Sequence, residues 1–262
     1  MSEIHRQAVV SPQARLGPGV RIGAFAVVGD EVELGEGCLL YSHAVIQGPA
    51  RFGRRNVFHP FVSLGGDPQD LKYRGERTEL VAGDENVFRE SATVSRGTAG
   101  GGGVTTIGSG SLFMAYSHVA HDCHIGDRTI FANGATLAGH VSVEDFATIG
   151  AFSPVHQFCR IGRYAYIGAS TVITQDVPPF SRVVTERATR CYGANSIGLR
   201  RHGFSSEQIE AIERAFRLLL LSKLNTAQAL EQMRATLGGS ADVQELIRFL
   251  ESVPLAGRGV TK

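Results

Sequence analysis

Histidine is unevenly distributed along this 262-residue chain. Five of its nine histidines fall in one short stretch: His118, His121, His124, His140 and His156. Neutral imidazole has a pKa suited to general-base catalysis near neutral pH. Asp122 follows His121 directly, and a carboxylate beside an imidazole can orient it or raise its basicity. This stretch is therefore the first candidate for acid–base chemistry.

Lysine is also distributed unevenly. The chain has 23 arginines and three lysines, and Lys72 is the only lysine among the first 222 residues. A solvent-exposed loop residue is one interpretation. The other is an ammonium group that binds a phosphate or an acidic partner.

A six-residue repeat predicts the elements that carry these side chains. An apolar residue recurs at every sixth position from Val10 to Leu64 and from Ile107 to Ile173, and less regularly from Ala82 to Val94. In the last run, the residue two positions earlier is always small. Hexapeptide repeats of this kind indicate a parallel β-helix. Three hexads make an 18-residue coil, and about eight coils stacked ~4.8 Å apart would rise roughly 40 Å.

The repeat also predicts two domains. Residues 1–192 are expected to form the β-helix, with insertions near 66–81 and 95–106, where solenoids often carry a binding face. Pro178 and Pro179 end the pattern, and helical periodicity follows. The run from Ser205 to Gln208 has the form of a capping box, and Thr226 and Ser240 are candidate caps of two further helices. Residues 193–262 are therefore expected to form an α-helical C-terminal domain.

The 18-residue coil brings distant polar residues together. Counting by 18 places His121 beneath Gly139 and Gln157, and Asp122 beneath His140 and Phe158. A glycine N–H at such a position can approach the oxygen of a reacting carbonyl. The alternative is a solvated polar ladder, since outward positions of a β-helix are often polar. The predicted cluster comprises His118, His121, Asp122, Gly139, His140, His156 and Gln157.

The cysteines indicate packing and not disulfide bonds. Cys38, Cys123 and Cys159 occupy the small inward-facing position of the repeat. Cys123 and Cys159 are two coils apart, about 9.6 Å by the strand spacing, which exceeds the reach of a disulfide.

Composition excludes several classes of protein. The net charge of +1 and the absence of a basic tail argue against nucleic-acid binding. No apolar run approaches the ~18 residues of a membrane span, and the polar start MSEIHRQ lacks the layout of a signal peptide. We therefore expect a cytoplasmic protein without an integral membrane segment.

Several motifs carry a close resemblance to one enzyme family. They are DPQDLKY (67–73), RGT (96–98), AHDC (120–123), LAGHVSVEDFA (137–147), VHQFC (155–159), QDVPP (175–179) and GLRRHGFS (198–205). Together they resemble the acyl-[acyl-carrier-protein]–UDP-N-acetylglucosamine O-acyltransferases, which catalyse the first step of lipid A biosynthesis. The resemblance implies a left-handed β-helix and a homotrimer with sites between subunits. It also implies transfer of an (R)-3-hydroxyacyl group from acyl carrier protein to the 3-hydroxyl of UDP-N-acetylglucosamine, without a metal or other cofactor.

The resemblance assigns roles residue by residue. His121 matches the general base, Asp122 its orienting neighbour and Gly139 the backbone donor to the oxyanion. The substrate groove is matched by His118, His140, His156 and Gln157. In the first insertion, Asp70 and Lys72 match residues that contact the sugar and phosphate groups. In the tail, Asn195 matches a nucleotide contact and Arg201 a diphosphate contact.

Three further positions bear on specificity. Ala169 matches the residue that closes the end of the acyl groove, which implies a medium-to-long hydroxyacyl chain; packing of a turn is the alternative role. Ile197 stands where the family usually has Glu, and His202 where it usually has Arg. Both departures concern the contacts with the uridine side of the substrate.

Three other functions compete with this interpretation. The sister N-acyltransferase of the same pathway shares the β-helix but usually has a preceding domain, whereas the hexads here begin by residue 10. A γ-type carbonic anhydrase would hold zinc with His118, His121 and a histidine from a neighbouring subunit. A non-catalytic β-helix scaffold is the third possibility. The sequence leaves open whether the acceptor carries a 3-hydroxyl or a 3-amine.

Overall fold

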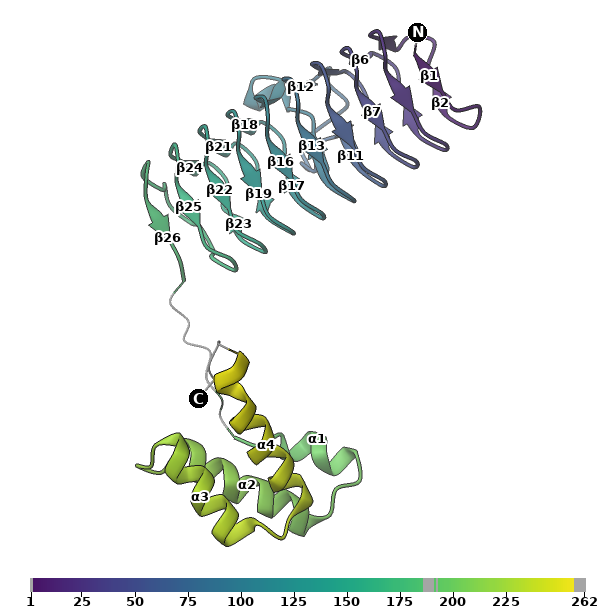
Figure 1. The fold of residues 1–262 in the computed structure, drawn as a ribbon. Coiled ribbons are helices and arrows are strands. Elements are labelled where there is room, and N and C mark those ends of the chain that lie inside the picture. The colour runs from purple at the N-terminus through teal and green to yellow at the C-terminus, as the bar shows by residue number, and fades with distance from the viewer. Residues whose placement is uncertain (1, 186–190, 192, 257–262) are drawn as a thin grey trace. The chain divides into compact units, whose positions relative to one another are not determined.

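The structure, a computed structural model, describes residues 2–185, 191 and 193–256. By contacts, the chain divides into two compact units, residues 1–185 and 186–262. All strands of the described residues lie in the first unit and all α-helices in the second (Figure 1). The predicted domain boundary, 192/193, falls between the last strand and the first α-helix, and residue 192 itself lies outside the described residues.

The first unit consists of three parallel sheets of very short strands. Sheet A contains β1 (Glu3–Ile4), β4 (Arg21–Ile22), β7 (Leu39–Leu40), β10 (Val57–Phe58), β13 (Val87–Phe88), β16 (Leu112–Phe113), β19 (Ile130–Phe131), β22 (Thr148–Ile149), β25 (Tyr166–Ile167) and β26 (Arg182–Val183). Sheet B contains β2 (Val9–Val10), β5 (Val27–Val28), β8 (Val45–Ile46), β11 (Ser63–Gly66), β14 (Thr93–Ser95), β17 (His118–Val119), β20 (Thr136–Leu137) and β23 (Pro154–Val155). Sheet C contains β3 (Arg15–Leu16), β6 (Val32–Leu34), β9 (Ala50–Phe52), β12 (Glu79–Ala82), β15 (Val104–Ile107), β18 (His124–Ile125), β21 (Ser142–Val143) and β24 (Arg160–Ile161).

Strand register follows the predicted 18-residue coil. Val119 of β17 pairs with Leu137 of β20, and Leu137 pairs with Val155 of β23. Each of the first eight coils contributes one strand to each sheet, and β25 and β26 extend sheet A beyond them. The predicted parallel β-helix is therefore confirmed.

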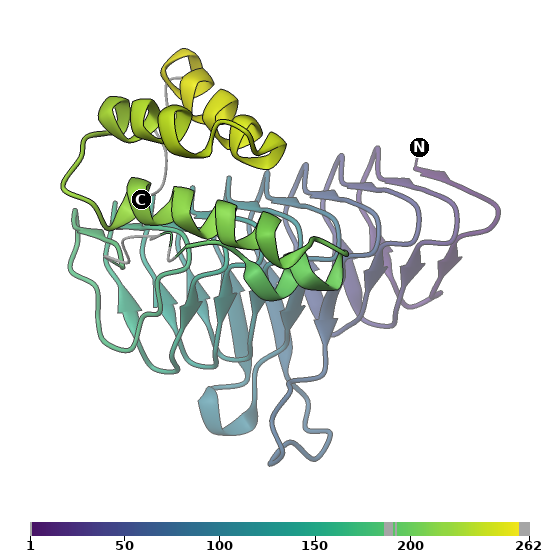
Figure 2. The same cartoon turned by 90° about the horizontal axis from the view of Figure 1, so that it is seen from below.

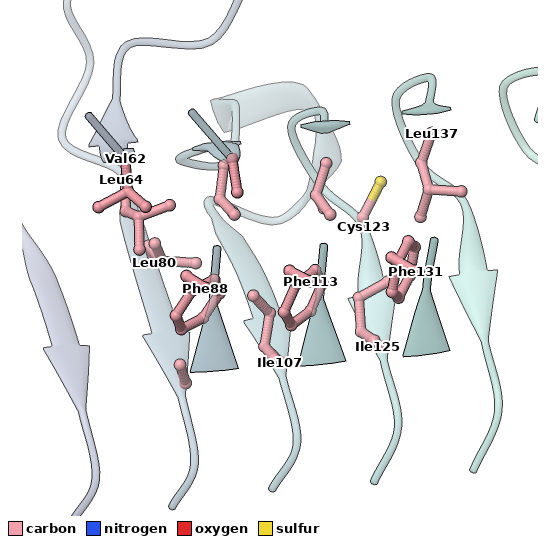
Figure 3. Close-up of a cluster of buried hydrophobic side chains, with 14 of the residues drawn as sticks. Val62, Leu64, Leu80, Phe88, Ile107, Phe113, Cys123, Ile125, Phe131 and Leu137 are labelled. Atoms are coloured by element: carbon pink, nitrogen blue, oxygen red, sulfur yellow. The ribbon is translucent and has the colours of Figure 1, made fainter. Parts of the chain in front are cut away.

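Large apolar side chains of the repeat fill the interior of the prism. Phe58, Phe88, Phe113 and Phe131 stack in sequence, with ring centroids 5.6, 4.8 and 4.8 Å apart. Figure 3 shows the last three side by side between the strands. Offset stacking of this kind adds to the stabilisation from burial. The three inward cysteines, Cys38, Cys123 and Cys159, are buried free thiols, which confirms their role in packing.

Two loops interrupt the coils and are shorter than the predicted insertions. Residues 67–78 connect β11 to β12, and residues 96–103 connect β14 to β15. The latter loop contains the 3-10 helix η1 (Ala99–Gly101), for which Thr98 is the N-cap. The predicted insertions extended too far because residues 79–81 and 104–106 belong to strands of sheet C, where they pair with one another. Figure 2 shows the two loops protruding next to each other from the same side of the β-helix.

The described part of the second unit contains four helices: α1 (Ser196–Arg201), α2 (Ser206–Leu220), α3 (Thr226–Leu237) and α4 (Ala241–Ala256). The capping box from Ser205 to Gln208 is confirmed. Thr226 was wrong as the cap of α3, because the Asn225 side chain accepts the Gln228 N–H in a second capping box. Ser240 precedes α4, and its hydroxyl accepts the N–H of Val243 at 3.4 Å. Among the described helices, none combines the length and the apolar character needed to cross a membrane.

Candidate active site

The histidine cluster lies along sheet B, where successive coils leave the sheet at one corner. His118 is in β17, and His121 and Asp122 follow that strand. Gly139 and His140 follow β20, and His156 and Gln157 follow β23. Since β17, β20 and β23 are consecutive neighbours in the sheet, the seven predicted residues occupy three adjacent coils. The stacking predicted by counting 18 residues is thus observed.

His121 and Asp122 form a hydrogen-bonded dyad. The Nδ1 atom of His121 lies 2.8 Å from Oδ2 of Asp122. Asp122 adopts a left-handed backbone conformation with φ of 60°, as do the residues six positions before and after it, Tyr116 and Arg128. A carboxylate can only accept, so Nδ1 carries the proton. The Nε2 lone pair of His121 is then available to take a proton from a substrate.

The loop after β14 fixes the carboxylate of the dyad. The Thr98 N–H donates to Oδ1 of Asp122 at 2.7 Å, and the Thr98 hydroxyl donates to Oδ2 at 2.6 Å. The Asp122 side chain is 1% exposed. Burial would raise the pKa of this carboxyl, but the hydrogen bonds from Thr98 and His121 outweigh it and hold the pKa below its usual range. Asp122 is therefore a fixed anion at neutral pH.

Gly139 lies directly over the imidazole of His121. A Cβ atom at this position would lie 2.6 Å from Cε1 and 2.8 Å from Nε2 of His121, too close for any side chain. Among the described residues, the Gly139 N–H has no hydrogen-bond acceptor, whereas the next N–H, of His140, donates to the His121 carbonyl at 3.0 Å. An unpaired N–H next to the candidate base could serve as the donor that an oxyanion requires.

His140 forms the next layer of the corner. Its Nε2 atom lies 3.7 Å from Oδ2 of Asp122, and its ring stacks on Phe158 with centroids 4.6 Å apart. Together with His121 and Asp122 it forms a group whose potential metal-ligand atoms lie within 4.8 Å of one another. Both Asp122 oxygens already accept short hydrogen bonds from Thr98, and Oδ2 also accepts from His121. These three hydrogen bonds hold the Asp122 carboxylate between Thr98 and His121.

His118 is partly buried below the dyad. The hydroxyl of Thr93, one coil earlier, is 2.8 Å from Nδ1 of His118. Burial, and to a smaller extent the nearby His121, lower the pKa of His118. This ring is consequently neutral at physiological pH, and its observed partner is the Thr93 hydroxyl.

Asp70 and Lys72 reach the cluster from the first loop. Both line a cleft of about 360 Å³ whose other walls include Thr98, His140 and Phe158. Oδ1 of Asp70 accepts the backbone N–H of Lys72 at 2.9 Å. Lys72 is thus an exposed residue that lines this cleft, within the β-helix unit that carries the dyad.

The remaining predicted residues lie farther from the dyad or in the other unit. His156 and Gln157 are exposed, and Nδ1 of His156 lies 3.1 Å from the Gln157 carbonyl oxygen. Ala169 is exposed in the turn after β25. Asn195 caps α1 by accepting the Gly198 N–H at 3.2 Å, and Arg201 is exposed in the last turn of α1. Their predicted roles stay predictions.

Sequence reasoning missed two residues that organise this site. Arg96 and Thr98 belong to the RGT motif, yet no role was predicted for either. The only available signal was the motif itself, because residues 96–103 leave the repeat and no period indicates where their side chains lie.

Two family models match the chain. The model described as bacterial transferase hexapeptide (six repeats) matches residues 13–48 and 105–139, and the model described as Udp N-acetylglucosamine O-acyltransferase, Domain 2, matches residues 176–261. An acyl-[acyl-carrier-protein]–UDP-N-acetylglucosamine O-acyltransferase from Stenotrophomonas maltophilia is 50% identical over 248 residues, which cover 95% of this chain and 94% of the relative. This chain belongs to that O-acyltransferase family.

Other members support the same assignment over the full length. The O-acyltransferase of Herminiimonas arsenicoxydans is 42% identical, with 100% of both chains covered. The solved structure of the UDP-N-acetylglucosamine acyltransferase of Francisella novicida has 36% identity and a TM-score of 0.69, covering 98% of this chain and 93% of that one. Membership of the O-acyltransferase family favours this interpretation over the N-acyltransferase, the carbonic anhydrase and the scaffold.

Proposed function

We propose that this chain transfers an (R)-3-hydroxyacyl group from acyl carrier protein to the 3-hydroxyl of UDP-N-acetylglucosamine, the first step of lipid A biosynthesis. The observation that carries the proposal is the hydrogen-bonded pair of His121 and Asp122 beneath the open N–H of Gly139. The names of the relatives supply the substrate class.

In the proposed reaction, the substrate hydroxyl is the nucleophile. Nε2 of His121 takes the hydroxyl proton as the oxygen attacks the thioester carbonyl, and Asp122 stabilises the resulting imidazolium. The carbonyl oxygen becomes an oxyanion that the Gly139 N–H can stabilise. When the tetrahedral intermediate collapses, the carbon–sulfur bond breaks and the thiolate takes the proton back from His121. No acyl-enzyme, metal or other cofactor is needed, and the carrier-protein thioester is a co-substrate.

The other residues would bind and orient the two substrates. Asp70 and Lys72 are suited to the sugar and to phosphate groups because they line the same cleft as His140. His118, His140, His156 and Gln157 form further parts of the groove wall. Asn195 and Arg201 are assigned to the nucleotide and the diphosphate, and Ala169 to the end of the acyl chain. We also propose a cytoplasmic homotrimer, in which a neighbouring β-helix completes each groove.

One assay tests this function. Purified protein would be mixed with a 3-hydroxyacyl carrier protein and one of three acceptors: UDP-N-acetylglucosamine, its 3-amino analogue or a UDP-3-O-acylglucosamine. Acylation of the first acceptor is expected. Preference for the 3-amino analogue would correct the acceptor, acylation of only the third would support the N-acyltransferase, and no transfer to any acceptor would refute the proposal.

A further inference from the structure

The RGT segment lies between the two parts of the site and contacts both. Thr98 faces the dyad and Arg96 faces the first loop, and one residue, Gly97, separates them. The Gly97 N–H donates to the Glu79 carbonyl at 3.3 Å. A Cβ atom on Gly97 would collide with the backbone of Gly103 and Val104. The segment is therefore held tightly between two strands of the β-helix.

Thr98 controls the orientation of the Asp122 carboxylate. Its N–H and hydroxyl bind different oxygens of that carboxylate, at 2.7 and 2.6 Å. Two donors on two oxygens define the plane of the carboxylate, and Oδ2 is the atom that lies 2.8 Å from the His121 ring. The Thr98 hydroxyl oxygen also accepts the Gly101 N–H at 3.2 Å. The hydroxyl thus links η1 to the dyad.

Arg96 holds the first loop, residues 67–78, against the β-helix. Its buried guanidinium donates to the carbonyl of Gly65 at 3.0 Å and also to the carbonyl of Gly48. It forms an ion pair with Asp67 and donates to the Tyr73 hydroxyl at 3.2 Å. One planar group therefore joins two coils of the β-helix to both sides of the loop segment that contains Lys72. Lysine could not form this set of bonds, because an ammonium lacks the fixed fork geometry.

The contacts continue from Tyr73 to the residues of the cleft. The Tyr73 N–H donates to the Asp70 carbonyl at 3.0 Å, and the Lys72 N–H donates to the Asp70 side chain at 2.9 Å. These bonds form a compact turn whose position depends on where Tyr73 and Asp67 are held. Arg96 therefore sets the distance between the turn and the wall formed by Thr98 and His140.

We infer that Arg96 and Thr98 are positioning residues for acyl transfer, with Thr98 orienting the dyad and Arg96 placing Asp70 and Lys72 against the bound substrate. This inference rests on the proposed function. It predicts that changes at two residues only two positions apart affect different kinetic parameters. Loss of the Thr98 hydroxyl should act on kcat, and loss of the Arg96 fork should act on KM.

Substitutions at Thr98 separate the contribution of its hydroxyl to activity from that of its methyl group. Thr98→Val keeps the shape and removes the hydroxyl, and we expect kcat to fall roughly 10-fold with little change in KM. Thr98→Ser keeps the hydroxyl and should restore most of kcat. Thr129→Val is the matched control, because Thr129 is also buried and donates its hydroxyl to Ser111 at 2.9 Å, away from the cleft. Equal activity of the Val and Ser variants would overturn the role of Thr98.

Substitutions at Arg96 test coupling to Lys72. We expect Arg96→Lys to raise the KM for the UDP-sugar roughly 10-fold with a smaller effect on kcat, and Tyr73→Phe to act in the same direction but more weakly. If Arg96 acts through Lys72, the Arg96→Lys and Lys72→Ala changes should not add in the double variant. Fully additive effects, or a fall in kcat alone, would overturn the role of Arg96.

Folding is measured for every variant so that a lost fold is recognised. Variants are compared at a temperature where circular dichroism shows each to be folded, and Tyr73→Phe replaces Arg96→Lys if the latter does not fold. A wild-type protein without acyl transfer would refute the proposed function. An active wild type whose Thr98 and Tyr73 variants are also fully active would refute only the positioning roles.

Discussion

The backbone N–H of His140 donates a 3.0 Å hydrogen bond to the carbonyl oxygen of His121. This bond joins the corner of one coil to the corner of the next. It holds Gly139, the residue before His140, against the imidazole of His121. The base and its candidate oxyanion donor are thus related by one coil of the repeat, and several predictions about activity depend on this relationship.

The dyad is expected to act as the general base. We expect His121→Ala to lower the rate of acyl transfer by at least ~10²-fold, the lower end for a lost general base, with binding of the UDP-sugar much less affected. Asp122→Asn should cost less, because the imidazole remains. Steady-state rates and direct binding of the UDP-sugar would measure both effects. Near-normal turnover of the His121 variant would make His118 or His140 the next candidate.

A side chain at Gly139 should displace the imidazole of His121. In Gly139→Ala the new Cβ would lie 2.6 Å from Cε1 of His121, so the ring or the backbone must move, and we expect kcat to fall at least ~10-fold. Gly29→Ala is a suitable control, since its Cβ would have 3.4 Å to the nearest neighbour. Equal rates for the two variants would show that the spacing of Gly139 and His121 does not matter for catalysis.

Ala169 is expected to limit acyl length. Each buried methylene contributes ~0.8 kcal/mol, so a groove closed one two-carbon step too early should cost about a decade in rate. We expect Ala169→Gly to favour longer chains and Ala169→Met shorter ones, measured with a series of hydroxyacyl carrier-protein donors. The same length preference in both variants as in the wild type would leave Ala169 with only a packing role.

The β-helix should lose stability in mild acid because of His118. Burial lowers the pKa of this residue in the folded state, so the unfolded chain binds a proton more readily. Stability is then constant above the ordinary histidine pKa of about 6.5 and falls below it, by at most ~1.4 kcal/mol per pH unit for one proton. We expect His118→Gln to reduce the fall in the melting temperature between pH 7.5 and 5.5. An unchanged pH dependence, matching that of an exposed control such as His5→Gln, would contradict this.

Assembly and metal content provide an independent check. We expect a homotrimer by light scattering and an unchanged rate after treatment with a chelator, because hydrogen bonds already occupy the Asp122 oxygens. A fully active monomer would contradict the shared groove. Stoichiometric zinc whose removal abolishes activity would instead support metal binding by His121, Asp122 and His140.

The repeat explains which features the sequence could predict. A period of six defines both the inward position of Phe113 and the 18-residue step from His121 to Gly139, so the core and the stack were predictable without a structure. The same count placed Phe158 over His140, and their rings do stack.

Features outside the repeat were not predictable in this way. The bonds of Thr98 and Arg96 come from a loop without a period, so the repeat gives no position for their side chains. The approach of Lys72 to the His140 wall depends on how two loops pack. The cap at Asn225 was missed because two adjacent residues, Asn225 and Thr226, both have suitable side chains, and only the helix start distinguishes them.

The 18-residue coil also limits how a chain of this family can change length during evolution. Whole coils added or removed before β10 would leave every pair between β17 and β23 in register, because each coil contacts only its neighbours. A single-residue insertion between His121 and Gly139 would move a different residue over the imidazole. Tolerance to insertions and deletions should therefore be high near the amino-terminal end in steps of 18, and very low between residues 118 and 157.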